Sequence, residues 1–351
     1  MATSAPTSLM FKVQRHEPEL ITPAEPTPHE LKLLSNIDDQ EHFRVLVPGV
    51  LIYRHNPSME GKDPVEVVRE ALSKALVFYY PFAGRIRQGP GRKLMVACTA
   101  EGVLFIEADA DVTVEQFGDP LIPPIPCLKE LLYNVPGSDG ILNCPLLLIQ
   151  VTRLRCGGFI VGFRGNHALC DAQGMGQFLS AVGEIARGAY APSVLPVWER
   201  HLLGARDPPH VTREHREYDE VPSNNIVLPH QIMCSSEISA IRKLVLVPLG
   251  LYYTNFDLVA ACAWRLRTVA LQLDPDEETR LICPVNVRGK LETPLPPGYY
   301  GNAFAIPAAI TTVRELCENS LDFAVQKVRK LKTRVDGEYM KSLADLRVLK
   351  G

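Results

Sequence analysis

Two stretches in the first half of the chain carry the hydrophobic period of an amphipathic helix. After Asp63, which suits an N-cap, and Pro64, which suits a first turn, apolar residues recur every three or four positions until Pro81. Residues 175–186 show the same period, and Gly188 follows as a fitting end. The sequence therefore predicts two helices here, each with one apolar face.

Two other segments have the composition of strands. Residues 44–55 are mostly apolar but contain Pro48, so they predict a strand that is broken at the proline. Residues 91–112 predict two strands that are joined by a turn at Glu101-Gly102.

A further strand pair is predicted for residues 146–154 and 159–167, around the turn sequence Cys156-Gly157-Gly158. Side chains alternate between the two faces of a strand, so His167 lies on the same face as Phe163. If that face packs on the core, His167 ends the strand pointing inward, just before the second helix.

The second half also mixes helix and strand patterns. Thr254-x-x-Asp257 is a capping box that opens a helix. Residues 281–290 predict a strand and 294–304 a loop. The helix that Thr254 opens has its apolar positions at Phe256, Val259, Cys262, Leu266 and Val269. A last amphipathic helix has them at Leu321, Ala324, Val328 and Val335.

These patterns favour an α/β fold with two domains. Residues 189–235 contain six prolines and a charged run, and are predicted as a crossover linker. An N-terminal domain is then expected at 1–188 and a C-terminal domain at 236–351. Helix and strand occur in both, as in an α/β architecture.

Composition excludes several classes of protein. The net charge is −3, so no basic face is expected for nucleic acid. The nine cysteines are scattered and form no C-x-x-C pair, which argues against a zinc cage and a disulfide framework. No signal peptide and no membrane span is expected, and a cytoplasmic location fits.

The chemical candidate is His167-Ala-Leu-Cys-Asp171. The same spacing recurs in His215-Arg-Glu-Tyr-Asp219, but that copy lies in a charged run and is interpreted as a solvated segment. His167 instead sits at an inward-facing strand end before an apolar helix. A histidine there can serve as a general base, because imidazole accepts protons near neutral pH.

Other interpretations of these residues remain open. His167 could be a hydrogen-bonded core histidine, and Asp171 could only cap the following helix. His167, Cys170 and Asp171 have the atom types of metal ligands, as in a metal-dependent hydrolase, but no second ligand cluster accompanies them. The chain has no G-x-S-x-G elbow, Walker loop or G-x-G-x-x-G.

Several segments, in order along the chain, resemble the BAHD acyltransferase family, and the similarity extends over essentially all 351 residues. Within that family the chain is most similar to the benzyl alcohol O-benzoyltransferases and related alcohol acyltransferases. The segments are KALVFYYPFAGRIR at 74–87, GNHALCDAQGMGQF at 165–178, LPVWERHLLGARDPP at 195–209, TNFDLVAACAWRLRT at 254–268, CPVNVRGKLETPLPPGYYGNAF at 283–304 and EYMKSLADLRVLKG at 338–351. The similarity to this subgroup of alcohol acyltransferases is strongest in two stretches, EGVLFIEADADVTVEQFGD and CPLLLIQVTRLRCGGFIVGFRGNH.

The resemblance implies two similar mixed-sheet α/β domains of the chloramphenicol acetyltransferase-like, CoA-dependent type, with a channel between them. It implies that His167 is the catalytic base and that Asp171 organises the site by pairing with Arg288. Gly174 matches the small residue after the family motif. The implied reaction passes an acyl group from an acyl-CoA such as benzoyl-CoA to a small alcohol such as benzyl alcohol, in a monomer without metal or permanently bound cofactor.

The chain departs from the family pattern in two places. The motif reads HALCDAQG where relatives more often have HTM before the small residue. The D-F-G-W-G motif is absent, so the second domain is expected to be incomplete and the chain truncated at its C-terminal end. The alternative to an active enzyme is therefore a catalytically impaired remnant of one.

Overall fold

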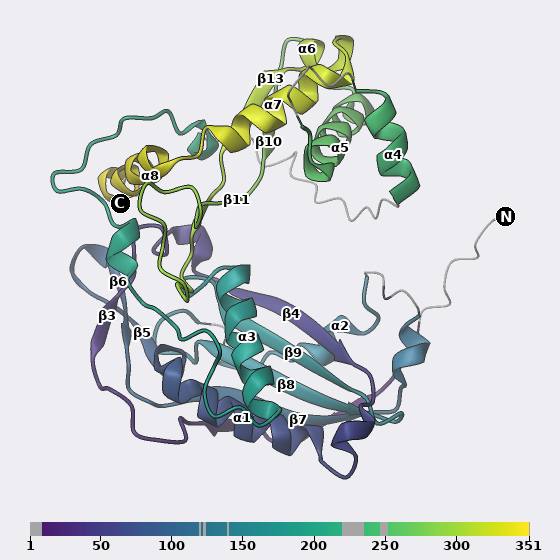
Figure 1. Ribbon diagram of the computed structural model, residues 1–351, viewed down its shortest axis with the longest axis vertical. Helices are drawn as coiled ribbons and strands as arrows, with labels where there is room; N and C mark the ends of the chain where they lie inside the picture. Colours follow the sequence, from purple (N-terminus) through teal and green to yellow (C-terminus); the bar gives the residue numbers. More distant parts are fainter. Residues whose placement is uncertain are drawn as a thin grey trace. The chain divides into compact units, whose positions relative to one another are not determined.

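The computed structural model describes residues 9–118, 121, 124–138, 140–219, 235–245 and 252–350 (Figure 1). These residues form two compact units. The first comprises the described residues up to Gly204 together with Pro296–Asn302, and the second those of Ala205–Leu295 and Ala303–Lys350. The boundaries predicted at 188 and 235 stay a prediction, and Pro222, Pro229 and Cys234 lie outside the described residues.

Short strands and a few long helices make up both units. The strands of the first unit are β1 Val13–Arg15, β2 Glu19–Ile21, β3 Leu31–Leu33, β4 Leu46–Tyr53, β5 Arg85–Gln88, β6 Leu94–Ala97, β7 Val103–Ala110, β8 Leu147–Leu154 and β9 Phe159–Asn166. Its helices are α1 Pro64–Phe78, α2 Leu128–Leu131 and α3 Ala172–Ala186. The second unit has β10 Glu278–Ile282, β11 Val285–Asn286, β12 Phe304–Ala305, β13 Ala308–Thr312, α4 Ser235–Lys243, α5 Asn255–Leu271, α6 Val313–Glu318, α7 Leu321–Thr333 and α8 Gly337–Lys350.

The first unit is built on a mixed sheet with the order β1-β7-β8-β9-β4, and β2 also pairs with β7. β7 and β8 are parallel, whereas the other pairs are antiparallel. β8 and β9 form the predicted pair, and Gly157 in their turn has a φ of 78°, which favours glycine. A smaller sheet has the order β3-β6-β5.

Helices α1 and α3 cover one face of this sheet (Figure 1). Both predicted helices are confirmed, and Asp63 caps α1 by accepting a hydrogen bond from the Val65 N–H at 3.2 Å. The core beneath them includes the fully buried rings of Phe82 and Phe178, whose centroids lie 4.6 Å apart. The face of β9 that carries Val161 packs against this core, as the alternation predicted.

Two predictions for the first unit need correction. β4 runs unbroken through Pro48, because β4 is the last strand in the order of its sheet, and an edge strand tolerates a residue without an N–H. The two strands predicted in 91–112 exist as β6 and β7, but they belong to different sheets, so the segment after Ala97 connects sheets and does not close a hairpin.

The second unit packs helices on short strand pairs. α5 contacts α7, β10 pairs with β13, and β11 pairs with β12. The Thr254–Asp257 capping box is present, and the buried Asp257 carboxylate also forms an ion pair with Lys332 of α7 at 2.5 Å. This contact joins the start of α5 to the end of α7.

Three predictions for the second unit were wrong in detail. The helix predicted after Thr254 is confirmed as α5, but its buried face carries Leu258, Ala261 and Trp264, and all five apolar positions of the predicted stripe are exposed or half-buried. The strand predicted at 281–290 is divided between β10 and β11, because Pro284 separates them. The predicted last helix ends at Thr333, and α8 follows it.

The cap of α1 gives a testable dependence on pH. The Asp63 carboxylate accepts a hydrogen bond from Arg153 Nε at 2.7 Å, and this contact, with the capping bond, lowers the pKa of Asp63 despite partial burial. A lowered pKa stabilises the fold above the unfolded value of about 4, and the contribution disappears as the pH falls below it. The thermal midpoint of wild type should therefore exceed that of Asp63→Asn at pH 7, and the gap should close towards pH 3. A gap that stays constant over this range would contradict the assignment.

Candidate active site

The turn between β9 and α3 presents His167. The strand ends at Asn166, whose side chain accepts a hydrogen bond from the Ala168 N–H at 3.0 Å, while the His167 N–H donates to the carbonyl of Val45 at 2.9 Å. The imidazole is partly exposed and stacks on Phe43, with the ring centroids 4.4 Å apart and the planes inclined by 17°. Stacking fixes the plane of the ring and leaves both ring nitrogens at its edge.

Asp171 occupies the N-cap position of α3. Its carboxylate accepts a hydrogen bond from the Gly174 N–H at 2.9 Å, and its side chain is buried. The structure therefore gives Asp171 a helix-capping role, which was the plainer of the two interpretations. Arg288 follows β11 in the second unit, where its N–H donates to the Asn286 side chain at 2.9 Å. The pairing of Asp171 with Arg288 stays a prediction.

Gly174 has a steric reason to be glycine. A Cβ added there would lie 1.9 Å from the carbonyl oxygen of Tyr300 and 2.9 Å from Cys170 Cβ. The loop of residues 296–302 therefore packs directly on the first turn of α3.

Replacing Gly174 with alanine should lower the free energy of unfolding by about 1–3 kcal/mol, because backbone atoms must shift to admit the new methyl group. Gly176→Ala is a matched control on the same helix, since a Cβ there meets no atom within 4 Å. Alanine at 176 should be neutral or stabilising. Urea unfolding of both variants checks the prediction, and equal stability of the two would contradict it.

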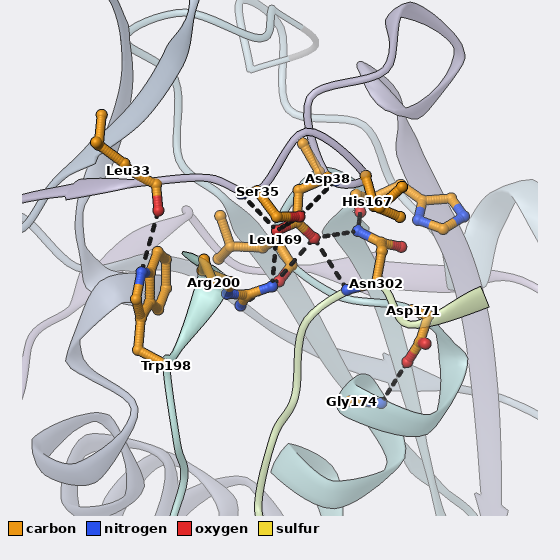
Figure 2. A network of polar contacts seen from close by, with 12 residues as sticks. Leu33, Ser35, Asp38, His167, Leu169, Asp171, Gly174, Trp198, Arg200 and Asn302 are labelled. Atoms are coloured by element: carbon orange, nitrogen blue, oxygen red, sulfur yellow. Dashed lines mark hydrogen bonds and ion pairs between the residues drawn. The ribbon is translucent and has the colours of Figure 1, made fainter. Parts of the chain in front are cut away.

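A buried ion pair lies beside the motif (Figure 2). Arg200 Nη1 contacts both carboxylate oxygens of Asp38 at 3.1 Å, and the two side chains are 2% and 0% exposed. Ser35 also donates to Asp38 from its N–H at 3.1 Å and from its hydroxyl at 2.7 Å. Burial is the largest single effect and lowers the pKa of Arg200, but the Asp38 carboxylate and the smaller effects of neighbouring groups together raise it, so the net shift is upward. The Arg200 guanidinium therefore keeps its positive charge inside the protein.

Asn302 connects this pair to His167. Its backbone N–H and its side-chain Nδ2 both donate to Asp38 Oδ1 at 2.9 Å, and Nδ2 also donates to the carbonyl of His167 at 2.8 Å. Arg200 Nη2 donates to the carbonyl of Leu169 at 2.8 Å. Two carbonyl groups of the motif are thus bound to one buried network, as Figure 2 shows.

Aromatic rings surround the Arg200 guanidinium. Its Cζ lies 4.3 Å from the ring centroid of Trp198 and 4.9 Å from that of Tyr300, and the Trp198 indole N–H donates to the carbonyl of Leu33 at 3.1 Å. A Cβ at Gly301 would lie 1.7 Å from Arg200 Nη1, so only glycine admits the guanidinium. Cation–π contacts of this kind are strengthened by the exclusion of water.

Sequence reasoning found His167, Asp171 and Gly174 but missed Asp38, Arg200 and Asn302. The available signal was weak: Arg200 and Asn302 lie inside two of the segments that resemble the BAHD family, but no pattern singles out these positions.

The second copy of the motif, His215–Asp219, was predicted to be a solvated segment, and this prediction is wrong for His215. His215 is buried, with Nδ1 3.0 Å from Glu217 Oε1 and Nε2 3.0 Å from Ser342 Oγ. This connectivity matches a Ser-His-Glu triad. However, Ser342 is completely buried, and its oxygen accepts hydrogen bonds from the N–H groups of Thr212 and Arg213 at 3.0 and 2.9 Å. The cluster is therefore structural, since no substrate carbonyl can reach the hydroxyl.

A cavity of about 420 Å³ lies elsewhere in the first unit, between the sheet and the helices α1 and α3. Phe159 and Val161 of β9 line it, whereas His167 follows the end of that strand, roughly 20 Å beyond Val161 at about 3.3 Å per residue. This cavity therefore does not contain the predicted base.

Within the described ranges, no group of three or more histidine, cysteine, aspartate or glutamate side chains is placed to hold a metal ion. None of the helices in the described part of the chain is long and apolar enough to cross a membrane.

Comparison with known proteins identifies the class. Residues 11–350 match the family model described as the Transferase family. The chain is 56% identical over 360 residues to benzyl alcohol O-benzoyltransferase of Petunia hybrida, which covers 100% of this chain and 78% of that protein. It is 57% identical over 354 residues to 13-hydroxylupanine O-tigloyltransferase of Lupinus albus, covering 98% of this chain and 78% of that protein.

Among solved structures, vinorine synthase resembles this fold with a TM-score of 0.70 at 22% identity, covering 97% of this chain and 79% of that one. The chain belongs to the BAHD transferase family. It is an acyl-CoA-dependent alcohol acyltransferase, and the predicted α/β fold of the CoA-dependent acyltransferases is confirmed.

Proposed function

We propose that this enzyme transfers an acyl group from benzoyl-CoA, or a closely related thioester, to a small alcohol such as benzyl alcohol, with His167 as the general base. The observation that carries the choice of substrates is the 56% identity to benzyl alcohol O-benzoyltransferase, which extends over 100% of this chain. The tigloyltransferase is similar to the same degree, so the acyl donor and the alcohol must both be tested.

The proposed reaction begins at the imidazole of His167. One ring nitrogen takes the proton of the acceptor hydroxyl while the alcohol oxygen forms a bond to the thioester carbonyl carbon. The tetrahedral intermediate then expels the CoA thiolate by breaking its carbon–sulfur bond. The thiolate takes the proton back from the imidazolium, so the products are an ester and free CoA with no net change in protons.

The geometry around His167 supports this role. The ring is partly exposed, so a hydroxyl group can approach it. Stacking on Phe43 holds the plane of the ring. The imidazole therefore loses less orientational entropy when it reaches its reactive position. Asp171 serves as a site-organising residue through its cap on α3, and we propose that its pairing with Arg288 adds to this role.

The test is a thiol-release assay with benzoyl-CoA and tigloyl-CoA, each with and without benzyl alcohol, combined with mass spectrometry of the ester. We expect thiol release that requires the alcohol, and benzyl benzoate as the product. Release without alcohol would indicate a thioesterase, and turnover of tigloyl-CoA alone would show that the assigned donor is wrong. No turnover with any pair would contradict the proposed function. The monomeric state and the cytoplasmic location stay predictions.

A further inference from the structure

We infer that Asp38, Arg200 and Asn302 are positioning residues for His167, and that they set the turnover number of the enzyme by holding the backbone of its base. The inference deepens the proposed function and rests on it, because it takes His167 as the base.

The orientation of the Asn302 amide is determined by its surroundings. Nδ2 lies 2.9 Å from the Asp38 carboxylate and 2.8 Å from the His167 carbonyl, which are both acceptors. The opposite orientation would place the amide oxygen against two other oxygens, so the nitrogen must face them. Each hydrogen of the NH₂ group then has one acceptor.

Arg200 holds the carbonyl of Leu169, two residues further along the chain, in the same way. Nη1 binds the Asp38 carboxylate, and Nη2 donates to the carbonyl of Leu169 at 2.8 Å. The carbonyl groups of His167 and Leu169 are therefore both bound to donors that share one carboxylate. Asp171 holds the other end of this turn, where it caps α3.

Burial makes this network rigid. Asp38 and Asn302 are 0% exposed and Arg200 is 2% exposed, so water does not compete for their hydrogen bonds. The peptide groups that follow His167 and Leu169 are each held by one such donor, and neither can rotate without breaking a charge-assisted or buried hydrogen bond. The Cα of the base, and with it the position of the imidazole, is fixed by groups that are themselves buried.

A catalytic base is sensitive to small displacements, since a shift of about 1 Å can cost roughly a hundredfold in rate. A purely structural network would affect only the amount of folded protein. The two roles are separable, because displacement of the base lowers the turnover number of folded enzyme, whereas instability does not.

The test compares Asn302→Ala with Gln150→Ala. Gln150 is a matched control, because it is also a buried amide in the same unit, and its Nε2 donates to the carbonyl of Glu130 at 2.9 Å, away from the motif. We expect Asn302→Ala to lower kcat by about 10- to 100-fold with KM values within about threefold, and Gln150→Ala to leave kcat unchanged. Enzyme concentrations are corrected for the folded fraction measured by urea unfolding.

Arg200→Lys supplies a second variant. Lysine keeps the positive charge beside Asp38, but its single ammonium cannot reproduce the two-nitrogen geometry that reaches Leu169. Arg200→Lys should therefore lower kcat, and its free energy of unfolding should fall by less than that of a variant with a neutral residue at position 200. If folded Asn302→Ala and Arg200→Lys both turn over as fast as Gln150→Ala, the positioning role is overturned.

A readout independent of turnover separates this inference from the proposed function. In protein labelled with ¹³C-histidine, the resonance absent from His167→Ala identifies His167 among the nine histidines. That resonance should shift or broaden in Asn302→Ala and stay unchanged in Gln150→Ala, whether or not the chain turns over the chosen substrates. An unperturbed His167 resonance in Asn302→Ala would overturn the inference even if His167 proves to be the base.

Discussion

Replacing His167 with alanine should lower kcat for ester formation by about 10²–10⁴-fold, which is the usual contribution of a general base. The expected loss falls on kcat, because the imidazole would accept the proton in the transition state and would contribute little to the binding of acyl-CoA. The partly exposed ring and its stacking on Phe43 are compatible with the proposed role as proton acceptor. Initial rates of thiol release at saturating acyl-CoA and alcohol measure the effect.

His16→Ala is the control for this variant. The His16 side chain is 52% exposed, and its Nε2 lies 3.5 Å from Oδ2 of Asp109, which belongs to β7 and not to the strand that precedes His167. It should leave kcat unchanged. If His167→Ala retained more than about one tenth of the wild-type rate, general-base catalysis by this residue would be excluded. Thermal unfolding of the variant shows whether a lower rate reflects lost folding.

Replacing Asp38 with alanine should destabilise the fold by about 3–5 kcal/mol, because the Arg200 charge then stays buried without its partner. The Ser35 and Asn302 donors also lose their acceptor, and unsatisfied buried donors are costly. At about 2–4 °C per kcal/mol, the thermal midpoint of the unit that contains them should fall by about 6–20 °C. Differential scanning calorimetry provides the measurement.

Three further variants separate the cost of burying an unpaired charge from the cost of losing contacts. Asp109→Ala removes an exposed partner of Arg153, 3.6 Å away, and should cost no more than about 1 kcal/mol. Asp38→Leu combined with Arg200→Met should be less damaging than Asp38→Leu alone, because no uncompensated charge remains. A double variant that is less stable than the single one would show that the charge is not the dominant cost.

The elements that the sequence predicted well are those with local determinants. α1 and α5 begin at side-chain caps, Asp63 and Thr254, and the β8–β9 turn needs Gly157 in a conformation that other residues avoid. Such signals depend on neighbours a few positions away, so they can be interpreted without knowledge of the fold. The orientation of His167 also came from a local rule, the alternation of side chains along β9.

The buried face of α5 shows where this reasoning ends. Apolar residues occur around much of the helix, so two faces have helical spacing, and the contact with α7 decides which of them is buried. Leu258 and Trp264 are on the buried face, while Leu266 is 58% exposed. A single sequence contains the period of the pattern but not the position of the neighbouring helix.

The network around His167 could not be predicted for a similar reason. Asp38 is separated from Arg200 by 162 positions and from Asn302 by 264 positions, and none of the three lies in a pattern with a recognised period. Their chemistry becomes visible only when the folded chain places them within hydrogen-bonding distance. His167 was singled out because a strand and a helix were predicted on either side of it, whereas Asp38 lies in a turn, Asn302 in a loop, and Arg200 at the start of a short 3-10 helix.

The first unit has a consequence for dissection of the chain, because it is not contiguous in sequence. A fragment cut after Gly204 would lack Pro296–Asn302, and with it Tyr300, which is buried against Tyr79 and Phe82. Such a fragment would retain the histidine motif with an unfilled hole in its aromatic core and no donor for the His167 carbonyl. An engineered minimal unit must therefore rejoin this heptapeptide to the fragment through a designed connection, or supply it as a separate peptide in the manner of fragment complementation.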